Sequence, residues 1–395
     1  MMQEHRYDSA GANLVWRRFS GPAADEIFVH SRPDPGQPQD VALQTAALYQ
    51  TLGSFLRQEK GSLEHIVQEV VFFRNVRRDF APFQKARLQV FDALAGALPQ
   101  LPASTIIEQP PLDPHACLAI SAMAVIPRGG ALPGCSPQSP ALGRSFLLGK
   151  HRHFCAGSIY GDPGSAFDQT FSMFCRADGI LEKEGMSFHD VVRTWIYLRH
   201  MERDYAEFNR GRREFFRQRQ ITLLPASTGI CGSPLSEESD FALSLCAIKA
   251  PERLAASAMT TPTLNEACTY GADFSRGLRV VEENKIALYV SGTASVDEGG
   301  ITAHVNDFAG QVNRMLLNVE TLLSEQHASF RNVLSAVTYL KTPGDAPILH
   351  RILRDRGLDD LPNALVHAAV CRPDLLCEME AIAALPLPGP PQAID

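Results

Sequence analysis

The sequence of 395 residues lacks any apolar run long enough to cross a membrane, and it lacks a Cys-x-x-Cys pair. Its longest apolar stretches, such as 67–73 and 375–385, fall well short of the roughly 18 residues that a membrane helix needs. The first eight residues are polar and show no apolar core of a signal peptide. The nine cysteines are odd in number and scattered, which argues against a disulfide framework or a zinc ribbon. These absences predict a soluble protein of the cytoplasm.

An excess of positive charge is also missing. The chain has 37 basic and 44 acidic residues, for a net charge of −7. A chain with this balance has no electrostatic reason to hold a phosphate backbone, so nucleic acid is not an expected partner. The hydrophobic content of 45% excludes a disordered chain. At roughly 150 residues per domain the length predicts two or three domains. The motif search suggests neither a cofactor nor a metal site.

An internal repeat of domain size organises the chain. Pro-Ala-Ser-Thr begins at Pro102 and again at Pro225, and the weaker Pro-Asn-Ala-Leu begins at Pro362. Upstream of each proline, an amphipathic helical pattern is followed by a β-branched and aromatic run and then by a second helical pattern. Downstream comes an alternating apolar strand. The first helices open at Gln44, Gln169 and Gln311; the runs cover 67–73, 191–198 and 333–340; the second helices cover 83–98, 205–217 and 347–356; and the last strands cover 117–125, 241–248 and 375–384.

Each unit therefore predicts the order strand, strand, helix, strand, helix, strand. This is an α+β unit in which two helices pack on one face of a sheet. Segments rich in Pro, Gly and Ser separate the units. The predicted division is unit one at 21–127, a linker at 128–145, unit two at 146–251, a linker at 252–264 and unit three at 265–388.

With this repeat, the sequence resembles the Rid superfamily (YjgF-type, often labelled imine/enamine deaminases). The most specific stretch is the last strand, Cys-Arg-Pro-Asp-Leu-Leu-Cys-Glu-Met-Glu-Ala-Ile-Ala from Cys371, which is similar to the family's closing Glu-x-Glu strand. The resemblance implies small α+β subunits that assemble as trimers with ligand sites in the clefts between neighbours. Three tandem copies then imply an intramolecular pseudo-trimer with three non-equivalent clefts.

Units two and three resemble the chorismatases, which hydrolyse chorismate to pyruvate and a benzoate or dihydrobenzoate. The stretches that carry this are Trp-Ile-Tyr-Leu at 195–198, Tyr-Ala-Glu-Phe-Asn-Arg-Gly-Arg at 205–212, Phe-Ser-Arg at 274–276, Ser-Gly-Thr-Ala-Ser at 291–295 and Val-Cys-Arg-Pro-Asp-Leu-Leu-Cys-Glu at 370–378. The first unit looks more like an ordinary Rid domain.

Carboxylates survive in one copy of the last strand. When the last strands of units three, two and one are aligned by their Ala-Ile, Ala-Ile and Ala-Val ends, Glu378 aligns with Ser244 and Ser121. In the same alignment Glu380 aligns with Cys246 and Met123. A buried acid is costly unless it is paired or used, so this pattern predicts one working cleft with Glu378 as the catalytic group. The alternative is a glutamate at a strand edge that only forms a salt bridge.

The cation that would bind a substrate carboxylate is not at the usual place. Rid proteins that hydrolyse imines carry an arginine just after the family proline, where this sequence has Ser104, Ser227 and Ala364. Arginine suits bidentate carboxylate binding. The candidates are Arg276, Arg212 and Arg372. By the resemblance, Arg276 and Arg212 match substrate-facing positions; the alternative for each is a solvated charge.

The resemblance implies hydrolysis of an enolpyruvyl ether, whose methylene carbon must be protonated before water attacks. Glu378, on an apolar strand, is the expected general acid. By the same resemblance Cys371 helps to choose the hydroxybenzoate product, or it is a small buried residue. Tyr205 lines the pocket or packs in the core. The partner expected is a small-molecule carboxylate, bound by a monomeric pseudo-trimer or a higher homo-oligomer of it.

Two other functions stay open. One is a Rid-type deaminase or cyclase that uses Glu378 to activate water on an imine or enamine. The other is a non-catalytic protein whose clefts only hold a small acid.

Overall fold

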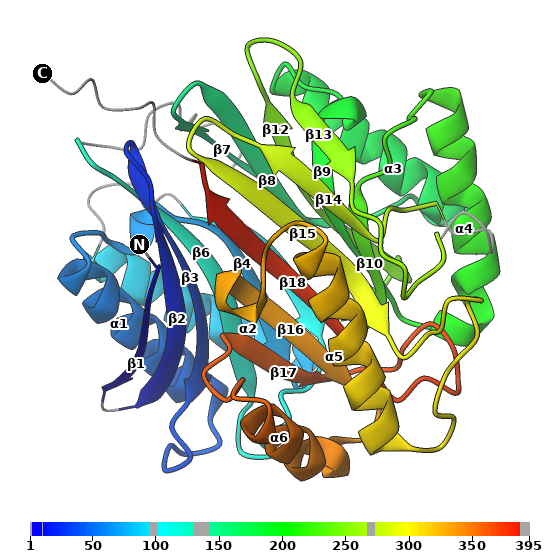
Figure 1. The fold of residues 1–395 in the computed structure, drawn as a ribbon. Helices are drawn as coiled ribbons and strands as arrows, with labels where there is room; N and C mark the ends of the chain where they lie inside the picture. The colour runs from blue at the N-terminus through cyan, green and yellow to red at the C-terminus, as the bar shows by residue number, and fades with distance from the viewer. Residues whose placement is uncertain (1, 10, 95–100, 130–142, 267–272, 388–395) are drawn as a thin grey trace, which may run out of the picture.

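The computed structural model describes residues 2–9, 11–94, 101–129, 143–266 and 273–387. In these residues the strands form three sheets of seven, five and six strands. Helices pair on the outer side of each sheet, and the sheets face one another across the middle of the molecule (Figure 1). The α+β architecture of three sheet units is the one that the repeat predicts.

The elements follow the repeat in chain order. Unit one contains β1 (Met2–Ser9), β2 (Ala12–Ser20), β3 (Ala24–Pro33), α1 (Val41–Gln58), β4 (Ile66–Phe73), α2 (Val76–Leu94), β5 (Ala103–Glu108) and β6 (Leu118–Pro127). Unit two contains β7 (Gly143–Leu148), β8 (His151–Ile159), α3 (Ala166–Lys183), β9 (Val191–Leu198), α4 (Met201–Gln218), β10 (Ala226–Cys231), β11 (Ser233–Pro234) and β12 (Phe241–Lys249). Unit three contains β13 (Ala255–Ala258), β14 (Gly277–Val281), β15 (Lys285–Ala294), α5 (Phe308–Ser324), β16 (Val333–Leu340), α6 (Ala346–Asp355), β17 (Asn363–His367) and β18 (Cys377–Pro386).

The three sheets share one strand order. It runs β3-β6-β4-β5 in unit one, β8-β12-β9-β10 in unit two and β15-β18-β16-β17 in unit three. The short strand that follows the repeat proline runs parallel to its neighbour in every unit. The sequence analysis did not predict these three strands, because each has only five or six residues and lies directly after the proline, where the chain reads as a turn.

A buried glutamine in the first helix of each unit explains why that residue recurs. Gln44 accepts a hydrogen bond from the backbone N–H of Cys117 (2.8 Å), and Gln169 accepts one from Asp240 (2.9 Å). Gln311 accepts one from Leu376 (2.8 Å). In each unit the helix is thereby tied to the segment where the last strand begins.

Several predicted boundaries differ from the observed elements. The first sheet includes β1 and β2, which precede the predicted start at residue 21, and β13 lies inside the predicted linker at 252–264. Strands β1 and β13 are edge strands with weak apolar patterns, whereas β2 lies between β1 and β3. Helix α2 begins at Val76 instead of residue 83, because Asn75 caps it and Pro82 is accommodated within the helix. The predicted linker at 128–145 lies mostly outside the described residues.

Neighbouring units meet edge to face. Strand β5 contacts β8, β10 contacts β15, and β16 contacts β2 and β3, so the units close in a ring. Polar contacts cross each joint: Thr105 Oγ1 lies 2.6 Å from Ser244 Oγ, the Ser227 N–H donates to Ser291 Oγ (2.8 Å), and Arg17 donates to the carbonyl of Val333 (2.6 Å). The clefts between units are therefore formed within one chain.

Candidate active site in the cleft between units two and three

All six side chains that the sequence analysis singled out line one cavity of about 80 Å³ between units two and three. Unit two contributes Tyr205 and Arg212 from α4, and unit three contributes Arg276, Cys371, Arg372 and Glu378. Other residues of its lining are Phe208, Ser227, Gly229, Phe274, Gly292 and Leu375. Tyr205 and Cys371 also line an open surface groove of about 790 Å³ along α4, so the cavity adjoins solvent there.

Strand β18 places Glu378 at the floor of this cleft. Glu378 pairs with Tyr339 of β16 and Ala294 of β15, and it is 4% exposed. A Cβ atom at Gly292 would lie 2.0 Å from Glu378 Oε1, so only glycine leaves room for the carboxyl group. Burial, followed by the negative charge of Glu380, raises the pKa of Glu378 to about 8, against the opposing effects of Arg193 and Arg276. The carboxyl group is therefore protonated at neutral pH and can donate a proton.

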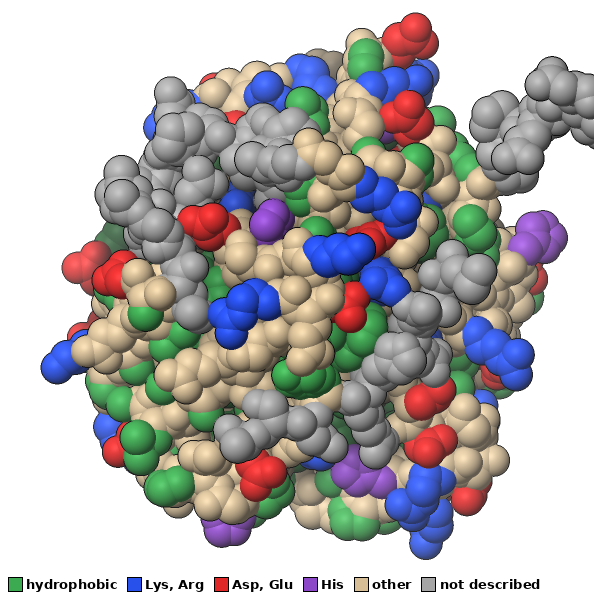
Figure 2. Space-filling model, turned by 90° about the vertical axis from the view of Figure 1, so that its left-hand side faces the viewer, with side chains coloured by type: hydrophobic (Ala, Val, Ile, Leu, Met, Phe, Trp, Pro, Cys, Tyr) green, Lys and Arg blue, Asp and Glu red, His purple; other side chains and the backbone are tan. Residues whose placement is uncertain are grey.

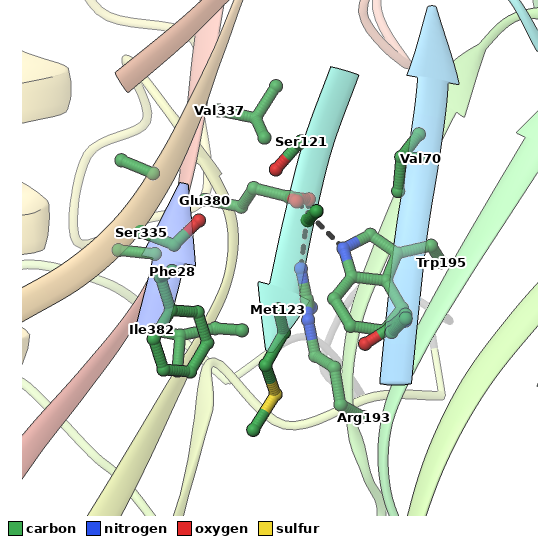
Figure 3. A pocket seen from close by; sticks show the side chains of 14 residues that line it. Phe28, Val70, Ser121, Met123, Arg193, Trp195, Ser335, Val337, Glu380 and Ile382 are labelled. Carbon is green, nitrogen blue, oxygen red and sulfur yellow. Dashed lines mark hydrogen bonds and ion pairs between the residues drawn. The ribbon is translucent and has the colours of Figure 1, made fainter. Parts of the chain in front are cut away.

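The neighbouring acid, Glu380, has a different environment. It lies in a small cavity of about 50 Å³ where residues of all three units meet (Figure 3). Arg193 Nη2 and Trp195 Nε1 of unit two donate to its carboxylate at 2.9 and 2.7 Å. Arg193 also donates to Thr228 Oγ1 (2.6 Å). With both oxygens held by a guanidinium and an indole, Glu380 is a buried ion-paired carboxylate that joins units two and three.

The strand register corrects the alignment of the acids. Glu380 pairs with the fifth residue of β16, as Ser244 pairs with the fifth residue of β9 and Ser121 with that of β4. Glu380 is therefore the structural equivalent of these serines, and Glu378 is the equivalent of Ala242 and Ala119. The earlier alignment was wrong by two residues, because β18 continues beyond Ile382 and its Ala-Ile pair does not mark the same position. Only unit three has acids at these two positions.

Two arginines from different units share one aromatic ring. The guanidinium carbons of Arg212 and Arg276 each lie 5.7 Å from the ring centroid of Phe274. Arg212 donates to Asn209 Oδ1 (2.7 Å), and Arg276 donates to the carbonyl of Asn265 (2.8 Å). Both arginines are buried. Both line the cavity, where a guanidinium group suits the binding of an incoming carboxylate.

The remaining three residues lie toward the groove. Arg372 donates to the carbonyl of Gly300 (2.7 Å) and is half-buried. Burial and the charge of Glu378 raise the pKa of the Cys371 thiol to about 12, so this group is a neutral thiol at the cavity wall. Tyr205 stacks on Phe208 with ring centroids 6.1 Å apart.

Some residues that shape the site were not recognised from the sequence. Arg193 and Trp195 hold Glu380, but the sequence analysis assigned neither of them a contact with this acid. A charged residue inside the apolar strand 191–198 was the available signal, since burying Arg193 requires an acid nearby. The strand register also shows that Asn363, and not Ala364, is the structural equivalent in unit three of Ser104 and Ser227. None of these three is an arginine.

The described residues show no helix long and apolar enough to span a membrane. Nor do they contain a group of three or more His, Cys, Asp or Glu side chains that could hold a metal ion. On the face shown in Figure 2, the side chains drawn in colour carry both signs of charge, interspersed.

The described chain consists of three similar α+β units with a cleft between units two and three, and comparisons with known proteins show what it is similar to. The family model Endoribonuclease L-PSP matches residues 271–385, in unit three. The chain is 28% identical to a 3-hydroxybenzoate synthase from Streptomyces hygroscopicus, over 58% of this chain and 73% of that protein. It is 27% identical to the 3-aminoacrylate deaminase RutC from Acinetobacter baylyi, over 24% of this chain and 77% of that protein.

A solved chorismatase structure shares the fold. It superposes with a TM-score of 0.60 at 17% identity, covering 81% of this chain and 93% of the chorismatase chain. The resemblance to the Rid superfamily, and the further resemblance to chorismatases, are thus confirmed.

Proposed function

We propose that this protein is a chorismatase-like enzyme that cleaves the enolpyruvyl ether of chorismate in the cleft between units two and three. The observation that carries the proposal is a buried carboxyl group, Glu378, that holds its proton at neutral pH within the same cavity as two buried arginines. Similarity to a 3-hydroxybenzoate synthase and to the chorismatase fold supports this substrate class.

The chemistry follows from the groups in the cleft. Glu378 donates its proton to the methylene carbon of the enolpyruvyl group, which becomes a methyl group next to an oxocarbenium centre. Water attacks that centre and returns a proton to Glu378, and the hemiketal then breaks its bond to the ring oxygen to release pyruvate. A neutral Glu378 also avoids repelling the two carboxylates of the substrate, which Arg276 and Arg212 bind and orient.

The product with the ring is proposed to be a hydroxybenzoate. This assignment rests on the similarity to the 3-hydroxybenzoate synthase and on Cys371 as a neutral thiol at the cavity wall. In this branch the diol ring loses water as it becomes aromatic, which balances the water consumed in forming the hemiketal. In the hydrolytic branch the dihydrobenzoate diol is released instead. Both branches give one pyruvate for each chorismate.

The decisive experiment is incubation with chorismate, with pyruvate measured through lactate dehydrogenase and the ring product separated by chromatography. Glu378→Gln should abolish pyruvate formation, because the amide cannot protonate carbon. Glu252→Gln, at an exposed acid outside the cavity, should leave the rate unchanged. Pyruvate formation equal in native and Glu378→Gln protein, or none in native protein, would remove the proposal.

Two other measurements separate the alternatives. A deaminase would accelerate ammonia release from a freshly generated 2-imino acid; the absence of an arginine at Ser104, Ser227 and Asn363 speaks against it. A binding protein would hold a small carboxylate equally well after Glu378→Gln and would turn over neither substrate.

A further inference from the structure

A second and larger cavity lies between units three and one. Its volume is about 630 Å³, within the range of sites that bind small molecules. Helix α6 and strand β17 form one wall, and β2, β3, β6 and the segment 111–116 form the other. One edge is closed by backbone hydrogen bonds from His367 to the carbonyl of Pro110 (2.8 Å) and from Leu112 to the carbonyl of Leu365 (3.4 Å).

The length of helix α6 explains why this cavity is open. Helix α6 has 10 residues, whereas its counterparts α4 and α2 have 18 and 19. The shorter helix leaves space beside β17. In unit one the longer helix instead carries Arg87, which forms a buried ion pair with Glu69 and donates to Ser104 Oγ (2.9 Å). The cavity also contains Ala119, the structural equivalent of Glu378, so it has no proton donor at that position.

The cavity is lined by two polar side chains, His30 and Asn363, and the Asn363 amide has unused hydrogen-bonding capacity. His30 is 7% exposed; its Nε2 lies 3.2 Å from Ser335 Oγ, and its ring also interacts with the backbone of Pro362. Asn363 accepts from Thr338 (3.0 Å), while its Nδ2 has no described partner. A buried polar atom without a partner costs free energy that a ligand can recover. Burial lowers the pKa of His30 to about 4, so the ring is neutral.

Two arginines from different units line the cavity. Burial, followed by the charges of Arg32 and Arg354, lowers the pKa of His350. Arg32, on β3, and Arg354, on α6, are both exposed and both line the cavity. Neither forms an ion pair with a carboxylate in the described part of the chain, although Asp113 and Asp359 also line the cavity. Apolar side chains also line the cavity, namely Val15, Leu112, Ile120, Leu353 and Leu361.

We propose that this cavity binds, without turning it over, a second small molecule: a cyclic or aromatic carboxylic acid. Its carboxylate is bound by Arg32 and Arg354, its ring packs on the apolar walls, and a polar substituent contacts His30 and Asn363. The site depends on unit one and on α6, and it is separate from Glu378 and the arginines of the other cleft.

The test is calorimetric titration of the full chain with benzoate and with benzamide, its neutral counterpart. The double variant Arg32→Gln/Arg354→Gln should weaken benzoate binding roughly tenfold or more through loss of both charged contacts. Ala119→Phe, which fills the cavity, should act in the same direction. Arg351→Gln, on the same helix but outside the cavity lining, is the matched control and should change nothing.

Benzoate could also bind in the cleft of Glu378, so Arg276→Gln is titrated in parallel. The proposal predicts that the site sensitive to Arg32 and Arg354 persists in Arg276→Gln and prefers benzoate to benzamide. Binding that disappears in Arg276→Gln but is unchanged in the double variant and in Ala119→Phe would overturn it. Absence of benzoate binding at millimolar concentration, or equal binding of benzamide, would also overturn it. Melting curves establish that each variant is folded.

Discussion

Replacing Glu378 by glutamine should stabilise the protein, and by an amount that depends on pH. The carboxyl group keeps its proton up to a pKa of about 8 in the folded chain, against an ordinary value of 4.5. Between these values the unfolded chain has lost the proton that the folded chain still holds, so native stability falls as pH rises. At about 1.4 kcal/mol for each pKa unit, the cost grows to roughly 5 kcal/mol near pH 8. Glutamine, which does not titrate, removes it.

The predicted change in melting temperature follows from the length of the chain. An unfolding entropy of about 2.1 cal/mol/K per residue gives roughly 0.8 kcal/mol/K for the whole chain, so about 5 kcal/mol corresponds to about 6 °C. We expect the melting temperature of Glu378→Gln, relative to native protein, to rise steadily from pH 5 to pH 8. The change of this temperature difference with pH is the diagnostic quantity, because any effect of the new amide on local hydrogen bonds is the same at every pH. Glu252→Gln should show no slope. A flat difference for Glu378→Gln would refute the protonated state of the acid.

Three further outcomes are expected. Glu380→Gln leaves Arg193 buried without its ion pair, so it should lower the free energy of unfolding by roughly 3–5 kcal/mol. The same substitution removes a negative neighbour and should therefore lower the pKa of Glu378. The alkaline limb of the pH–rate profile, expected near pH 8, should then move to lower pH. Arg276→Gln should raise KM for chorismate by roughly tenfold or more, because the variant loses a charged contact to a substrate carboxylate. Iodoacetamide at neutral pH should leave Cys371 unmodified in the folded protein and modify it in urea, as peptide mass spectrometry can show, because burial keeps the thiol protonated.

The repeat made most of the fold predictable from the sequence. The central strands 191–198 and 333–340 were predicted with the observed bounds, because long apolar runs between two helical patterns leave one interpretation. The strands after the prolines were missed for the opposite reason: each has only five or six residues, and its pairing partner is distant in sequence. Local pattern carries no information about such a partner.

The candidate site was partly predictable. The cluster around Glu378 followed from a resemblance between motifs, which names residues but does not say how far apart they lie. Sequence alone could not tell Glu378 from Glu380 by environment. Two positions along one strand place both side chains on the same face, and it is Arg193, from another unit, that makes one of them an ion pair. The cavity beside α6 was also invisible, because it results from a helix that is short relative to its counterparts.

Having both walls of the cleft on a single polypeptide has a practical consequence. In an assembly of separate identical subunits, dilution can take a shared pocket apart, and one substitution alters every copy of it. Here the wall bearing Arg212 stays joined by the backbone to the wall bearing Glu378 at any protein concentration. Specific activity should therefore be constant down to the most dilute assay, and each substitution alters a single cleft, which lets the other clefts diverge in sequence.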